Sequence, residues 1–228
     1  MNVKCDIATI AATIGDRTRA RILDALAGGE PMTATELAHQ TGVSAQTMSA
    51  HLAKLCHMKL VSLRRFGRHR YFLLASKEVA SALEALAVIA PKQPVVSLRQ
   101  SDEANALKRA RMCYDHLAGA IGVAITNNLE KKGYIRPSRR QFLITPGGQR
   151  WFANFGIDLE ALRHARRKQA VQCVDWSERV PHMAGALGAA IAKRVLDLGW
   201  LKRRPHDRAL SPTAEGRKAL RAAFGITL

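Results

Sequence analysis

The 228-residue sequence contains no apolar run of the roughly 18 to 20 residues that a helix needs to cross a bilayer. It also begins without the apolar stretch of a secretory signal, since residues 1–6 read MNVKCD. Aromatic residues make up only 5% of the chain, and 18 acidic side chains stand against 36 basic ones. The first two absences predict a cytoplasmic protein that has no membrane partner.

Cysteine is also scarce, because the chain has only four cysteines and they lie far apart, at positions 5, 56, 113 and 173. None belongs to a CxxC pair, and zinc-finger spacing is absent, so the spacing predicts neither a structural metal site nor a bound cofactor. Without an export signal, the thiols are expected to be reduced. The sequence also lacks a glycine-rich phosphate loop, a nucleophile elbow and paired catalytic carboxylates, and it does not predict an enzyme.

Basic residues are abundant, and the formal net charge is +18. This excess predicts a polyanionic partner, while 47% apolar residues exclude a globally disordered chain. Residues 1–94 carry 12 basic and 7 acidic side chains, and residues 95–228 carry 24 and 11. The sequence APKQP at 90–94 stops any helix that reaches it. We expect a first domain over 1–94, two further domains over 95–168 and 169–228, and a linker over 91–101.

The first domain has the pattern of a helix-turn-helix motif. Two short helices are expected on either side of Gly15, and Thr33 with Glu36 has the spacing of a capping box at the next helix start. Gly42 suits the left-handed residue that ends a helix, and Ser44 is placed to cap the following helix. The residues of this following helix that are expected to face inward are Met48, Leu52 and Leu55. The small or polar residues expected to face outward are Ala45, Gln46, Thr47, Ser49 and Ala50. Such an outer face can approach base edges in the major groove.

A basic hairpin follows this motif. Strands near 60–63 and 71–74 are joined by a turn at Gly67, and the intervening residues carry four arginines and a histidine. A basic hairpin after a helix-turn-helix is typical of a wing that contacts phosphates or the minor groove, although a charge run is more usually a solvated turn.

An amphipathic helix is expected over residues 77–90. Its apolar face and that of residues 3–14 remain uncovered in a domain of this size. Pairing across a twofold axis would bury both faces, and packing against the second half of the chain is the alternative.

The residues that carry a family resemblance are these: DRTR at 16–19, Ile22, Leu23 and Leu26, then Ser44, Gln46, Ser49, His51, Leu52 and Leu55, then Leu60, Val61, Gly67, Arg68 and Tyr71. Over residues 8–90 the chain resembles the ArsR/SmtB family of winged-helix repressors, in a long-tailed subgroup whose C-terminal half is duplicated. The resemblance implies a homodimer on a palindromic operator that is released by a metal, a redox change or a small molecule. The DNA-binding residues expected are Ser44, Gln46, Thr47, Ser49, His51, Lys54, Arg64, Arg65, Arg68, His69 and Arg70. The family's metal-ligand patterns are absent, since Glu36 to His39 and the helix at 77–90 lack them.

The second half of the chain contains an internal repeat. Cys113 to Ile125 aligns with Cys173 to Ile191, with an insertion of residues 176–181 in the second copy, and LITPGG at 143–148 resembles LSPTAEG at 210–216. Each copy is expected to fold as helix, short basic hairpin and helix, a degenerate winged-helix pattern. A Gly-x-x-Gly pattern at 119/122 and 185/188 is expected to let the helices of the two copies approach closely. The predicted fold class is therefore mainly α with small β-hairpins.

The repeated Cys-x-Asp…His residues are the effector candidates: Cys113, Asp115, His116, Cys173, Asp175, Trp176 and His182. Cys113 and His116 are expected on one face of a helix. If the two copies pack face to face, thiols, carboxylates and imidazoles could converge and bind a thiophilic metal or act as a thiol switch. A small-molecule pocket lined by Tyr114, Trp151, Trp176 and Trp200 is another alternative, and ordinary core packing of these residues is a third.

The leading hypothesis is a dimeric, sequence-specific DNA-binding regulator, a repressor whose C-terminal half senses an effector such as a small molecule. The alternative is a sequence-independent, nucleoid-type protein that binds DNA through its basic tail.

Overall fold

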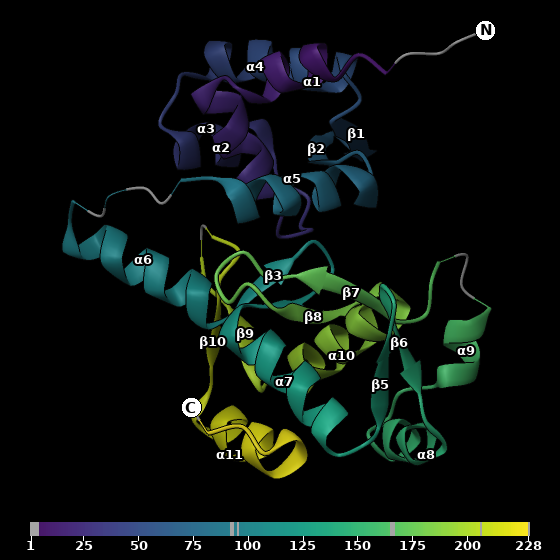
Figure 1. The fold of residues 1–228 in the computed structure, drawn as a ribbon. Helices are drawn as coiled ribbons and strands as arrows, with labels where there is room; N and C mark the ends of the chain where they lie inside the picture. The colour runs from purple at the N-terminus through teal and green to yellow at the C-terminus, as the bar shows by residue number, and fades with distance from the viewer. Residues whose placement is uncertain (1–4, 92–93, 95, 165–166, 206, 228) are drawn as a thin grey trace, which may run out of the picture. The chain divides into compact units, whose positions relative to one another are not determined.

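The computed structural model describes residues 5–91, 94, 96–164, 167–205 and 207–227 (Figure 1). Val3, Lys4, Lys92, Gln93 and Val95, on which the predicted dimer segment and linker partly rest, lie outside the described residues. The chain divides into two compact units, Met1–Leu83 and Glu84–Leu228. In the part of the chain that the structure describes, no helix combines the length and the apolar composition needed to span a bilayer.

The first unit has the helix-turn-helix and hairpin that the sequence predicts. Its elements are α1 (Ile7–Ile14), α2 (Arg17–Leu26), α3 (Ala34–Thr41), α4 (Ala45–His57), β1 (Val61–Phe66), β2 (His69–Leu74) and α5 (Lys77–Ile89), which continues past the unit boundary.

Local capping fixes the helix boundaries of this unit. Thr33 and Glu36 form the predicted capping box at the start of α3, and the Ser44 hydroxyl accepts a hydrogen bond from the backbone N–H of Thr47 at the start of α4. Gly42 ends α3 in the left-handed conformation, at φ +72°. These sequence predictions are confirmed. The predicted inward-facing residues of α4 are also buried, namely Met48, Leu52 and Leu55.

The second unit contains the remaining elements: α6 (Leu98–Arg109), β3 (Arg111–Cys113), β4 (His116–Ala118), α7 (Gly119–Lys131), β5 (Ile135–Ser138), β6 (Gln141–Ile144), α8 (Pro146–Asn154), α9 (Leu159–Arg163), β7 (Val171–Val174), β8 (Pro181–Ala184), α10 (Gly185–Asp197), β9 (Leu201–Arg203), β10 (Leu210–Pro212) and α11 (Ala214–Phe224). The predicted linker over 91–101 is wrong at its end, because Ser97 caps α6 and the helix begins at Leu98.

The order hairpin, helix, hairpin, helix occurs twice in this unit, from β3 to α8 and from β7 to α11. The prediction of a helix at Cys113 and His116 is wrong, because these two residues face each other across the β3–β4 hairpin. Tyr114 turns the chain at φ +60°, and α7 begins only at Gly119, at φ +77°. A short hairpin with these positive φ values replaces the expected helical turn.

The two halves of the second unit exchange their hairpins. Helix α7 of the first half packs on β8, where the Met183 N–H donates to Oγ1 of Thr126 at 2.9 Å, and helix α10 of the second half packs on β4. The hairpin β7–β8 extends the β5–β6 hairpin into a four-stranded sheet through the pairing of Gln141 with Val171. Reciprocally, β3 meets the β9–β10 region, where the Met112 N–H donates to the carbonyl of Arg208 at 2.9 Å.

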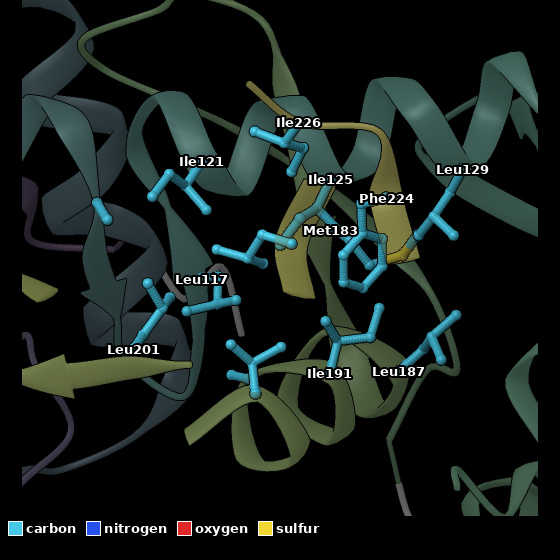
Figure 2. Packing of buried hydrophobic residues seen from close by; sticks show 14 of the residues in the cluster. Leu117, Ile121, Ile125, Leu129, Met183, Leu187, Ile191, Leu201, Phe224 and Ile226 are labelled. Carbon is cyan, nitrogen blue, oxygen red and sulfur yellow. The ribbon is translucent and has the colours of Figure 1, made fainter. Parts of the chain in front are cut away.

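One hydrophobic core therefore serves both halves. Figure 2 shows side chains of α7, such as Ile125, close to those of α10, such as Ile191, with Met183 of β8 among them. Each of these three side chains is at most 4% exposed. Because burying a large aliphatic side chain contributes about 1.5–3 kcal/mol, this shared core ties the two halves into one folded unit.

The predicted role of the Gly-x-x-Gly pattern is wrong. A Cβ on Gly122 would lie 2.5 Å from the carbonyl oxygen of Leu117, and a Cβ on Gly188 would lie 2.3 Å from that of Met183. The missing side chains of these glycines leave room for the backbone of the hairpin that precedes each helix. They do not serve the packing of one helix against the helix of the other half.

Candidate functional site

The outward face of α4 presents short polar side chains to solvent. Gln46, Thr47 and Ser49 are exposed, and Oγ of Ser49 donates to the carbonyl of Ala45 at 2.9 Å. The Ser44 cap fixes where the helix begins. This is the arrangement that base-edge contacts require, because short hydrogen-bonding groups let a helix approach the floor of the major groove.

Two further predicted contact residues of α4 differ in their exposure. Lys54 is exposed, whereas the His51 side chain is only 18% exposed, with Nδ1 3.9 Å from Oδ1 of Asp16. Asp16 is the N-cap of α2, so His51 joins α4 to the start of that helix.

The wing is strongly basic and open to solvent. The residues predicted to contact DNA here are all exposed: Arg64, Arg65, Arg68, His69 and Arg70. Arg65 and Arg70 face each other across the β1–β2 ladder, and the turn at Gly67 has φ +57°. Like charges directly opposite each other destabilise a hairpin, so a counter-charge supplied by a bound polyanion would relieve this repulsion.

The helix and the wing border the same groove. Ser49 and Cys56 of α4 and Arg70 of β2 line one open depression in the first unit. Ser49 of the polar face of α4 and Arg70 of the basic hairpin therefore lie at the same depression of this unit.

A second group of functional side chains lies in the second unit, where the two exchanged hairpins meet. Cys113 pairs with His116 across β3–β4, and Cys173 pairs with His182 across β7–β8. One sulfur or nitrogen atom from each of the four residues lies within 4.8 Å of the others. The imidazole rings of His116 and His182 stack with their centroids 5.1 Å apart. The fold thus brings together the thiols and imidazoles for which the internal repeat left convergence open as one alternative.

The imidazoles of this Cys2His2 cluster are buried and incompletely hydrogen-bonded. His116 is 7% exposed and His182 is 0% exposed. Nδ1 of His116 lies 3.3 Å from Oδ1 of Asp115, and the ring's Nε2 has no hydrogen-bond partner among the described residues. Neither ring nitrogen of His182 has one within the same part of the chain. Unsatisfied buried polar groups are costly, so these nitrogens call for an explanation.

The electrostatics of the cluster differ between its two imidazoles, because Cys113 and Asp115 outweigh burial and raise the pKa of His116 to about 9. A hydrogen bond with the Cys173 side chain, together with burial, raises the pKa of the Cys113 thiol well above its usual range. Burial and the neighbouring His116 lower the pKa of His182 to about 3, so this ring is neutral at neutral pH. A neutral imidazole is a ready metal ligand, and a thiol becomes one by losing its proton.

Asp175 and Trp176, two of the predicted effector residues, are bound to Arg111 instead. Nη2 of Arg111 lies 3.0 Å from Oδ2 of Asp175, and the guanidinium carbon lies 4.4 Å from the centre of the Trp176 ring. Burial alone would raise the pKa of Asp175, but Arg111 and hydrogen bonds to Ser177 and Gly119 hold it well below its usual range. Sequence reasoning missed Arg111, because nothing in a chain with 36 basic residues marks one of them as fully buried.

The four aromatic residues predicted to line one pocket are not grouped in that way. Trp151 stacks on Phe155, whose ring also contacts Trp200, so these two tryptophans share an aromatic cluster against the core. Trp176 lies over Arg111 and Tyr114 occupies the β3–β4 turn.

Sequence comparisons with known proteins agree with the first of these two sites. A helix-turn-helix domain family model matches residues 14–64. A relative from Bacillus subtilis (strain 168), described as the uncharacterized HTH-type transcriptional regulator YdfF, is 40% identical over 98% of this chain and 99% of its own length. The HTH-type transcriptional regulator KmtR of Mycobacterium tuberculosis is 37% identical over 33% of this chain and 57% of its own. A homodimeric winged helix-turn-helix DNA-binding domain from Mycobacterium bovis, Mb0332, is 28% identical and covers 39% of this chain and 89% of its own, at a TM-score of 0.35.

Proposed function

The chain belongs to the ArsR-like family of winged helix-turn-helix transcriptional regulators, and from this membership we propose that it works in the cytoplasm as a homodimer on a pseudo-palindromic operator. In this proposal it represses transcription until an effector binds the second unit. The observation that carries the DNA-binding surface is the common groove, bordered by Ser49 of α4 and Arg70 of the wing.

In the proposed complex the two parts of this surface have different tasks. Gln46, Thr47 and Ser49 read base edges, because their short amide and hydroxyl groups are exposed on α4. The wing cations contact phosphates, which gives affinity without reading sequence. Ser44 caps the same helix, and His51 links it to α2. Lys54, which is exposed, contacts a phosphate.

The proposed dimer rests on the exposed apolar face of α1. Ile7 is 75% exposed, and Thr13 is the one buried residue of this fully described helix. Apolar side chains of a helix are unfavourably exposed to water, so we propose that a second copy of the chain covers this face of α1. Symmetry would then set the two α4 helices about one DNA turn apart, roughly 34–36 Å.

We further propose that residues 95–168 and 169–228 are tandem copies of one unit, which together form the effector module. The same details recur in both. Thr145 and Thr213 cap α8 and α11, accepting from the N–H groups of Gly148 and Gly216, respectively. A Cβ on either glycine would collide with the carbonyl oxygen of Tyr134 or of Trp200, at 2.0 and 1.9 Å. The same threonine cap and the same crowded glycine at matching places in both segments favour a duplication of one segment.

DNA binding to the region upstream of the protein's own gene tests the proposal. Fluorescence anisotropy should show affinity for one upstream site at least about 1,000-fold above that for scrambled DNA at the same salt concentration. Gln46→Ala should reduce this discrimination by about 1–3 kcal/mol, and Gln100→Ala, at an exposed glutamine of α6, serves as the matched control. Equal affinity for both duplexes would instead support the sequence-independent, nucleoid-type alternative and would overturn the operator proposal.

A further inference from the structure

The Cys2His2 cluster has the composition of a tetrahedral metal site. Two thiols and two imidazoles are the donor set that zinc takes in structural sites, and thiolates select soft or borderline ions over magnesium and calcium. Zinc–sulfur bonds of about 2.3 Å and zinc–nitrogen bonds of about 2.0–2.1 Å would set tetrahedral ligand atoms about 3.3–3.8 Å apart. The four ligand atoms already lie within 4.8 Å of one another. Small side-chain rotations would close the remaining gap.

We propose that Cys113, His116, Cys173 and His182 bind one zinc-class, thiophilic divalent cation between the β3–β4 and β7–β8 hairpins. The ion would join the two halves of the second unit, since each half supplies one cysteine and one histidine. This site goes beyond the proposed DNA binding and does not depend on it.

The unpartnered imidazole nitrogens favour a metal over a disulfide. A bond between Cys113 and Cys173 would use both sulfurs. It would leave buried Nε2 of His116 and both ring nitrogens of His182, which have no hydrogen-bond partner among the described residues. A bound cation instead satisfies one nitrogen of each ring and both sulfurs at once.

Neighbouring groups orient one of the proposed ligands. The Asp115 carboxylate faces Nδ1 of His116 at 3.3 Å, so Nδ1 keeps its proton for Asp115 and Nε2 is the nitrogen that would release its proton to bind a cation. Arg167 in turn binds the other oxygen of Asp115. Cys173 is only half-buried, so an ion can enter from its side. A carboxylate that orients a ligand histidine and an entry path for the ion are two features expected of a metal site.

Cobalt binding by the full-length chain tests the proposal directly. The reduced protein, freed of metal with a chelator, is titrated with Co²⁺ under anaerobic conditions. We expect one equivalent per chain, with the intense visible bands of tetrahedral Co²⁺ and a thiolate-to-cobalt charge-transfer band, and we expect Zn²⁺ to displace it. Substoichiometric binding, or a spectrum without the charge-transfer band, would overturn the proposal.

Single substitutions assign the site to these residues. Cys173→Ser should weaken Zn²⁺ binding by more than about 100-fold, and Asp115→Asn should weaken it by about 10- to 100-fold through loss of the oriented imidazole. Cys56→Ser, at a half-buried cysteine of the first unit, is the matched control and should leave binding unchanged. Zn²⁺ affinity that survives Cys173→Ser would refute the site, and tryptophan fluorescence of each variant confirms that the second unit is folded.

The thiol switch is distinguished by oxidation. Bound Zn²⁺ should protect both cysteines from disulfide formation by a mild oxidant. A disulfide between Cys113 and Cys173 that forms equally fast with and without Zn²⁺ would overturn the metal site in favour of redox chemistry. Since none of these measurements involves DNA, their failure would leave the proposed regulator function intact.

Discussion

Nη2 of Arg111 lies 3.0 Å from Oδ2 of Asp175, and both side chains are 0% exposed. Arg111 belongs to β3 and Asp175 follows β7, so this buried ion pair joins the two halves of the second unit. The same carboxylate accepts hydrogen bonds from the backbone N–H groups of Gly119, Ser177 and Glu178. Such a network offsets the desolvation of the two charges only while it is complete.

Removing the charged Arg111 side chain should destabilise the second unit strongly. Arg111→Met leaves the Asp175 charge buried and should lower the free energy of unfolding by about 3–5 kcal/mol. Urea unfolding followed by tryptophan fluorescence measures this, because Trp151, Trp176 and Trp200 all belong to the second unit. Lys193→Met breaks an exposed pair with Asp197 and should change stability by less than about 1 kcal/mol. Equal effects of the two variants would contradict the structural role of the buried pair.

Two adjacent glycines of α8 should respond oppositely to alanine. A Cβ on Gly148 would lie 2.0 Å from the backbone oxygen of Tyr134, whereas a Cβ on Gly147 meets only Oγ1 of Thr145, at 3.7 Å. We expect Gly148→Ala to cost at least about 1–3 kcal/mol and Gly147→Ala to be neutral or to stabilise by up to about 1 kcal/mol. Thermal unfolding of both variants measures the difference, and a tolerated Gly148→Ala would refute the close approach of α8 to Tyr134.

Loss of a wing cation should weaken binding to all DNA sequences alike. Arg68→Ala removes an exposed charge at the tip of the wing, so operator and scrambled DNA should lose affinity by a similar factor. The slope of log affinity against log salt should also become shallower by about 1. Lys77→Ala, at an exposed cation of α5, is the control. A loss confined to the operator would show that Arg68 reads bases rather than phosphates.

A charge on α1 should dissociate the proposed dimer. Ile7→Asp would place a carboxylate in the expected interface, and sedimentation velocity should then show monomers at concentrations where the unmodified chain is dimeric. Leu98→Asp changes another exposed apolar residue, 87% exposed at the start of α6, and should leave the oligomeric state unchanged. If Ile7→Asp remains dimeric, the interface lies elsewhere.

The first unit could be predicted closely because its signals are local. The capping box of Thr33 with Glu36, the left-handed Gly42 and the Ser44 cap each act within four residues of chain, and the structure contains all three. The wing was likewise indicated by its turn at Gly67 between two short apolar runs. Local hydrogen bonding and backbone sterics decide such features, so the amino-acid order suffices to find them.

Local signals do not predict the second unit in the same way. The helix expected at Cys113 and His116 is a hairpin, because Gly119 at positive φ starts α7 after these residues and the strands find partners in the other half. Nothing in the local sequence indicates that exchange.

By itself, then, the amino-acid order determined the helix-turn-helix, its caps, the basic wing and the presence of similar segments in the C-terminal half. Only the tertiary structure decided that those segments exchange hairpins, that Arg111 and Asp175 form a buried pair, and that two cysteines 60 positions apart share a cluster with two histidines. The physical reason is range: caps and turns depend on neighbours in the chain, whereas the cluster depends on packing between segments that only the shared core brings together.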